Sequence, residues 1–199
     1  MSDFMQFLSE FVILFLTTVF LENTVFARGF GLSRAIAMTR RPRSILVYGT
    51  LLTLLTLLGG IGCYLAGHLF PAIPAYGTPL VYLAVIAAIY LLIYGILTRR
   101  GSRFREEAKK YMPVATFNCA VMGGIFLALF NGYELWQFIA IGLGNGVGFV
   151  LATLLLLNAD RALSRTEAPK AFAGFPLMLI YVGILAMVFY ALVGHRLPF

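Results

Sequence analysis

The chain has 199 residues, of which 61% are hydrophobic and only 12% are charged, and its formal net charge is +7. Soluble domains carry about 25% charged residues, so this composition excludes a water-soluble globular fold. It predicts an all-α integral membrane protein, whose apolar side chains face lipid as well as the core. The basic residues stand in short gaps between long apolar runs. Such gaps border lipid headgroups, so we expect the lipid bilayer, and no nucleic acid, as a partner.

Six apolar segments approach or exceed the length that crosses a bilayer, which is about 20 helical residues. We therefore predict six transmembrane helices in a single membrane domain, residues 1–199. The first segment lacks the basic start of a cleaved signal peptide, so we expect it to be a span. In chain order the predicted spans are residues 4–26, 45–70, 80–97, 114–130, 135–157 and 175–193.

The loops between these spans differ sharply in charge. The second and fourth loops contain no Lys or Arg, and the C-terminal tail contains only Arg196. Lys and Arg near span ends resist translocation, so the basic loops are predicted to be cytoplasmic and both termini to lie outside, N-out and C-out. The basic residues are Arg28, Arg34, Arg40, Arg41 and Arg43 in the first loop, Arg99, Arg100, Arg103, Arg105, Lys109 and Lys110 in the third, and Arg161, Arg165 and Lys170 in the fifth.

Polar residues and glycines interrupt the first and fourth spans at corresponding places. The interrupting residues are Glu22, Asn23, Thr24, Gly29 and Gly31 in the first, and Asn118, Cys119, Gly123 and Gly124 in the fourth. Three spans per half invert the second half relative to the first. We therefore predict two inverted three-helix repeats, residues 1–98 and 113–199, joined by a cytoplasmic loop at 99–112. Paired interruptions indicate a site near the bilayer midplane, where half-helix termini favour an anion or a negatively charged cofactor.

Several polar and small residues also have a purely structural interpretation. Glycines in membrane helices commonly serve close packing, which is favoured for residues 59–62 and 142–148 and stays open for the glycines at the breaks. Glu22 either lies at an aqueous boundary or takes part in a solute or ion path. Asn145 is expected to form an interhelical hydrogen bond. Cys63 is predicted to be a core residue, whereas the polar flank of Cys119 favours a ligand.

Four segments of the chain resemble a known family. They are residues 113–123 (PVATFNCAVMG), 146–157 (GVGFVLATLLLL), 168–189 (APKAFAGFPLMLIYVGILAMVF) and, more loosely, 22–33 (ENTVFARGFGLS). On these residues the chain resembles the membrane subunits of the Rnf and Nqr redox-driven ion pumps, of the group called RnfA in one pump and NqrE in the other. The resemblance implies a non-catalytic subunit of an ion-translocating electron transport complex in a bacterial or archaeal cytoplasmic (inner) membrane. Its implied partners are other Rnf/Nqr-like subunits and, in particular, an inverted paralogous RnfE/NqrD-like subunit.

The resemblance also implies a cofactor, an intramembrane [2Fe–2S] cluster shared by the paired subunits, with a cysteine ligand from each broken helix. Cys119 takes the position of one ligand. The family pattern at the first break reads Leu-Gly-(Ile or Leu)-Cys-Pro, whereas this chain reads Phe-Gly-Leu-Ser-Arg over residues 30–34, which places Ser33 at the other ligand. Asn118, Asn23 and Gly31 are expected to flank this cofactor.

Ser33 leaves three hypotheses open, because iron–sulfur clusters favour soft sulfur donors over oxygen. They are a serine-ligated cluster, a partner that supplies the missing ligand, and a fold kept without the cluster. The alternative function is a cluster-less inverted-repeat transporter or scaffold subunit, in which Glu22, Asn23 and Asn118 line the path of a solute.

Overall fold

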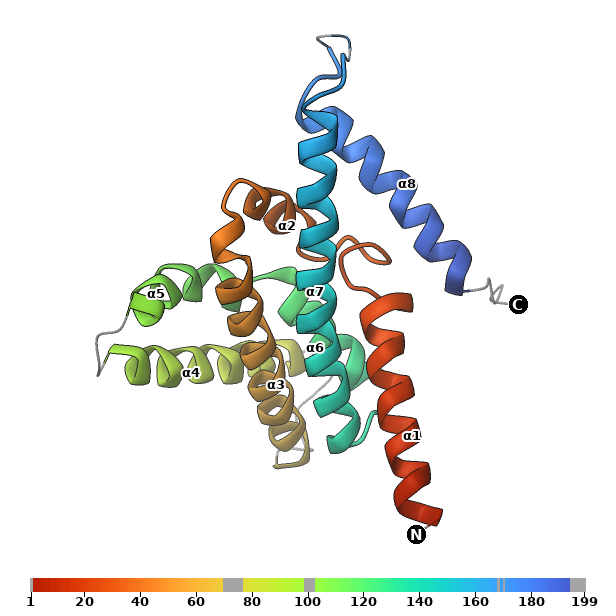
Figure 1. Ribbon diagram of the computed structural model, residues 1–199. Coiled ribbons are helices and arrows are strands. Elements are labelled where there is room, and N and C mark those ends of the chain that lie inside the picture. Colours follow the sequence, from red (N-terminus) through yellow and green to blue (C-terminus); the bar gives the residue numbers. More distant parts are fainter. Residues whose placement is uncertain (1, 70–76, 99–102, 168, 170, 194–199) are drawn as a thin grey trace.

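The computed structural model describes residues 2–69, 77–98, 103–167, 169 and 171–193, and all regular elements in this part of the chain are helices (Figure 1). The all-α membrane architecture predicted from composition is therefore confirmed. The described residues form eight α-helices, two more than the predicted spans, because residues 32–39 and 103–116 are helical although the sequence predicted loops over most of them. The elements are α1 (Ser2–Leu16), a π-helical turn η1 (Thr17–Leu21), α2 (Leu32–Thr39), a 3-10 turn η2 (Pro42–Ser44), α3 (Ile45–Leu69), α4 (Thr78–Thr98), α5 (Arg103–Thr116), α6 (Cys119–Phe130), α7 (Leu135–Leu163) and α8 (Phe175–Val193).

Four helical segments in the described part of the chain are long and apolar enough to cross a membrane: Phe4–Leu21, Pro42–Leu69, Thr78–Thr98 and Leu135–Leu163. The pair α5 and α6, bent by 53° at its break, makes a fifth candidate span. The predicted sixth span is α8, an apolar helix of 19 residues. The inverted relation of the two halves stays a prediction.

Most of the predicted loop at 99–112 is helical, because α5 begins at Arg103; residues 99–102 lie outside the described residues. The loop was predicted because most residues of this segment are charged. Small and apolar residues nevertheless recur at helical spacing, at Ala108, Tyr111, Met112 and Ala115, and all four are buried. They form one apolar stripe that packs α5 against α3 and α4, so tertiary contact converts the segment into an amphipathic helix.

The first span ends earlier than residue 26, because η1 closes at Leu21 and residues 22–31 form turns before α2 begins. Gly29 and Gly31 take positive φ angles of 70° and 74°, a backbone region that glycine adopts without steric cost. Arg28 and Arg34 consequently belong to the break and to α2. The charge pattern had placed both in the first loop. In the structure the basic residues of the connection from α2 to α3 are Arg40, Arg41 and Arg43.

The centre of the molecule is the pair α3 and α7, which form the most extensive helix contact (Figure 1). Glycines of α7 allow this approach. A Cβ atom at Gly142 would lie 3.2 Å from Leu57 Cα, and one at Gly146 would lie 2.9 Å from Thr53 Cα. The packing role predicted for residues 142–148 is thereby confirmed. Cys63 is completely buried within α3, as predicted for a core residue.

The first break lies beside the middle of α7. Asn23 bonds Gly148, which is close to the midpoint of that 29-residue helix. A helix of this length extends about 43 Å, which exceeds the roughly 30 Å thickness of a hydrocarbon core. The first break therefore packs against the middle of a helix that is long and apolar enough to cross a membrane.

Candidate functional site

The first break is held by the amide of Asn23, whose side chain is completely buried. Its Nδ2 donates to the carbonyl oxygens of Val19 and Gly148, each at 2.9 Å. Its Oδ1 accepts from the backbone N–H groups of Val25 at 3.0 Å and Phe26 at 3.4 Å. One side chain thus satisfies backbone groups that the interrupted helix leaves without partners, as burial in lipid requires.

The second break is organised by Asn118, which caps α6. Its Oδ1 accepts from the N–H of Ala120 at 3.1 Å, and its Nδ2 donates to the hydroxyl of Tyr48 on α3 at 2.8 Å. Extended backbone at Asn118 (φ −85°, ψ 135°) ends the preceding α5 turn and starts α6 in a new direction. Asn118 is therefore a structural residue of the break.

The two breaks are in direct contact, although 87 positions separate Gly31 from Asn118. A Cβ atom at Gly31 would lie 2.9 Å from Asn118 Oδ1 and 3.1 Å from Ala120 Cβ. Asn145 of α7 joins them, since its Oδ1 accepts from Thr24 at 2.6 Å and its Nδ2 donates to Ala120 O at 2.9 Å. The interhelical hydrogen bonds predicted for Asn145 are confirmed, and they connect both interrupted helices.

An open pocket lies where the breaks meet, and it contains the two residues predicted as ligands. We call it the Ser33–Cys119 pocket. Ser33 and Cys119 are both exposed, so the pocket opens to the outside of this chain. Its volume is about 360 Å³, and it is lined by Gly29, Gly31, Leu32, Ser33, Arg34, Val114, Phe117, Asn118 and Cys119.

The donor set of this pocket fits an iron–sulfur cluster at one position only. Cys119 offers an accessible thiol, whereas Ser33 offers a harder oxygen, and the guanidinium of Arg34 lies 5.7 Å above the Tyr48 ring in the same region. The buried Nε of Arg34 has no hydrogen-bond partner. Among the described residues no three His, Cys, Asp or Glu side chains gather as a metal site. Cys119 is the one cysteine among the residues that line this pocket.

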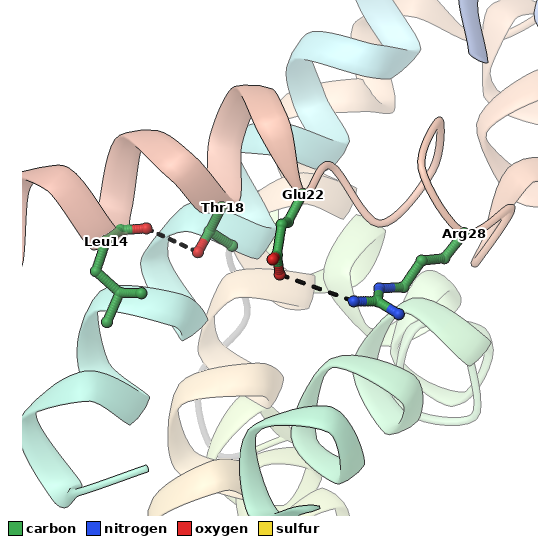
Figure 2. Close-up of polar contacts among 4 residues, drawn as sticks. All are labelled: Leu14, Thr18, Glu22 and Arg28. Atoms are coloured by element: carbon green, nitrogen blue, oxygen red, sulfur yellow. Dashed lines mark hydrogen bonds and ion pairs between the residues drawn. The ribbon is translucent and has the colours of Figure 1, made fainter. Parts of the chain in front are cut away.

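A second cavity also borders the first break, and Glu22 is one of its lining residues. We call it the Glu22 cavity. Its volume is about 70 Å³. Figure 2 shows the carboxylate of Glu22 and the guanidinium of Arg28 pointing toward each other, with Oε2 and Nη2 3.8 Å apart. The cavity is lined by Leu14, Thr17, Thr18, Glu22, Thr24, Arg28, Gly124, Leu127, Ala128, Asn131, Tyr133, Ile141 and Asn145.

The predicted site residues thus divide into three groups. Ser33, Cys119, Asn118 and Gly31 line one pocket, Glu22 lines another cavity, and Asn23 is buried as a structural residue between the elements. Sequence reasoning missed Tyr48 and the pairing of Arg28 with Glu22. The spacing of six residues between Glu22 and Arg28 gives no helical signal, because the chain turns there.

Comparison with known proteins covers nearly the whole chain. A family model described as "Rnf-Nqr subunit, membrane protein" matches residues 11–195. The A subunit of the "Na(+)-translocating ferredoxin:NAD(+) oxidoreductase complex" of Acetobacterium woodii is 26% identical over 188 residues, which are 94% of this chain and 98% of that relative. The A subunit of the "Ion-translocating oxidoreductase complex" of Syntrophotalea carbinolica is 28% identical over 192 residues, 94% and 98% of the two chains. Its counterpart of the same description from Aromatoleum aromaticum is 27% identical over 187 residues, 93% and 97%.

Proposed function

Because the chain belongs to the Rnf-Nqr family of membrane subunits, we propose that it is a membrane subunit of an ion-translocating electron transport complex. The observation that carries the proposal is the match over 94% of the chain to relatives described as the A subunits of such complexes. The two touching helix breaks, the first of which is bonded to the middle of the candidate span α7, support it, since paired interruptions of membrane helices form binding sites in transporters.

The partner we propose for the Ser33–Cys119 pocket is an inverted paralogous subunit. An exposed pocket with a thiol, a hydroxyl and a guanidinium is costly to leave against lipid, which offers these groups no hydrogen bonds. A protein partner removes that cost. In this pairing Cys119 is the one sulfur ligand that the chain contributes to a shared [2Fe–2S] cluster, and the partner contributes the rest. When bound, such a cluster supplies one-electron transfer; Asn118 and Gly31 hold the pocket walls, and Asn23 fixes the first break behind them.

Anaerobic purification of the tagged chain from its native membrane tests this function. We expect other redox subunits of the complex to co-purify, with iron bound and an EPR signal in the reduced state. Cys119→Ala should abolish the cluster signal, and Cys63→Ala, its matched control in the buried core, should leave it unchanged. Purification without redox partners would contradict the subunit role. An intact complex whose iron signal is the same with and without the Cys119 thiol would contradict the ligand assignment alone.

The proposed orientation is N-out and C-out in a cytoplasmic membrane. In this orientation the basic N-terminal end of α5 lies on the cytoplasmic side. Its support is the charge of the connections, since Arg40, Arg41 and Arg43 still follow α2 and the basic start of α5 follows α4. A reporter fused after Lys110 is expected to read cytoplasmic, and one fused after Phe199 external. The opposite pair of readings would refute the orientation and leave the fold untouched.

A cluster-less role is the second candidate, and the observation that favours it is the pair Ser33 and Arg34. A serine at the second ligand position and a guanidinium beside it suit an anion or a polar contact better than a second iron ligand. The chain then holds the partner in place and lines a path, without conducting electrons. Absence of iron from an intact, partnered complex would select this candidate.

A further inference from the structure

We propose that the Glu22 cavity binds a sodium ion. When the ion is absent, the guanidinium of Arg28 acts as a tethered cation, that is, a positive charge fixed to the chain that pairs with the Glu22 carboxylate in place of sodium. The proposal rests on the proposed function, because it assigns the translocated cation a place in this chain. It concerns a cavity separate from the Ser33–Cys119 pocket, since the two share none of their lining residues.

The cavity has the chemistry of a hard-cation site. Besides Glu22, four residues whose side chains carry an oxygen atom line the cavity: Thr17, Thr18, Thr24 and Asn131. Neither cysteine lines it. Hard alkali and alkaline-earth cations prefer such oxygen ligands, whereas soft metals prefer sulfur. A volume of about 70 Å³ holds an ion with a few waters, given that one water needs roughly 10–15 Å³ of such space.

The backbone around the cavity is irregular where the ion would enter. The π-helical turn η1 ends in the bond from Glu22 N–H to Thr17 O at 2.8 Å, and Thr18 donates its hydroxyl to Leu14 O at 2.9 Å (Figure 2). Single π turns accumulate at functional sites, because they shift side chains and free carbonyl oxygens relative to an α-helix. Here the turn points Glu22 toward α6 and the end of Arg28.

The charge balance explains why Arg28 is present. A carboxylate at the end of a candidate span is stabilised by a neighbouring cation, because lipid does not solvate a charge. Arg28 supplies that cation, but the 3.8 Å separation from Glu22 exceeds hydrogen-bonding distance. Arg28 is followed by Gly29, whose Cβ position has no atom within 4 Å, so the chain is loosely packed next to the arginine. A sodium ion can therefore take the place of the guanidinium beside the Glu22 carboxylate. The carboxylate then has a positive charge next to it both before and after the exchange.

The ion pair is also accessible. The side chains of Glu22 and Arg28 are 54% and 38% exposed, in contrast to the buried Thr18 and Thr24 behind them. The lining of the cavity therefore combines an exposed ion pair with buried polar residues, Asn145 among them. Since Asn145 also bonds Thr24 and Ala120, occupancy of the cavity is connected through one amide to the start of α6 at the second break.

The test uses the purified full-length chain in detergent, with unfolding temperature measured against sodium chloride while potassium or choline chloride keeps the ionic strength constant. We expect sodium to raise the unfolding temperature more than potassium or choline, because ligands that bind the folded state stabilise it. Glu22→Gln should abolish the sodium effect. Arg28→Gln should lower the sodium concentration at half-effect by about tenfold, because it removes the competing cation.

The controls are Glu10→Gln, an exposed carboxylate in α1 outside the cavity, and Arg161→Gln, an exposed arginine of α7. Both should respond to sodium as the unaltered chain does. Equal effects of sodium and choline, or a sodium effect retained in Glu22→Gln, would overturn the site. Weaker sodium binding in Arg28→Gln would overturn the tethered-cation role. Any of these results can occur in a chain that still co-purifies with its redox partners, so failure of this inference is distinguishable from failure of the proposed function.

Discussion

Asn145→Ala is expected to lower the free energy of unfolding by about 2 kcal/mol or more, given typical costs of leaving buried polar partners unsatisfied. The substitution removes the acceptor of the Thr24 hydroxyl and the donor to Ala120 O, and both partners stay buried. It also removes the hydrogen bonds by which Asn145 joins the two breaks, so electron or ion transfer by the complex should fall more than the loss of stability alone explains. Reversible unfolding in mixed micelles, together with the activity of the folded fraction, measures the two effects.

Asn158→Ala is the matched control, because Asn158 is an exposed residue of the same helix. It should be neutral or slightly stabilising, since alanine is the better helix former by a few tenths of a kcal/mol. Equal behaviour of the two variants would show that the hydrogen bonds of Asn145 contribute nothing measurable to the junction of the breaks.

Gly146→Ala is expected to cost about 1–3 kcal/mol of stability through overpacking. The added methyl would lie 2.6 Å from Thr53 Cβ and 2.9 Å from Thr53 Cα, so α3 and α7 must move apart. Since this helix pair is the centre of the fold, the separation also loosens the walls on which both breaks rest. The unfolding temperature of the purified chain in detergent measures the loss.

Gly183→Ala in α8 provides the matched control, because a Cβ atom there meets nothing within 4 Å. The same substitution should stabilise by about 0.5–1 kcal/mol at this position, since alanine has the higher helix propensity. The two changes therefore have opposite expected signs. An equal loss of stability in Gly183→Ala and Gly146→Ala would contradict this explanation. It would show that the close approach of α3 and α7 is not what makes alanine unfavourable at Gly146.

The sequence predicted the spans, both breaks, the burial of Cys63 and the hydrogen-bonding role of Asn145. Each follows from a local property: apolar length, a polar interruption, or a polar side chain in an apolar environment that must find a partner. The predicted helical ends were less accurate. The span was predicted to continue to Phe26 because apolar residues resume at Val25, yet the helix ends at Leu21, where the amide of Asn23 bonds backbone groups of α7 and the turn. No local pattern contains that long-range partner.

The sequence by itself determined that this chain is a membrane protein with two interrupted helices, because the bilayer imposes length and polarity on every segment. Only the tertiary structure decided what the interruptions form. Packing of α3 on α7 brings Gly31 against Asn118, separates Ser33 and Cys119 from Glu22, and turns Arg28 toward Glu22. These arrangements depend on contacts between residues far apart in the chain. Hydropathy and charge describe each segment alone, and they do not specify which side chains meet.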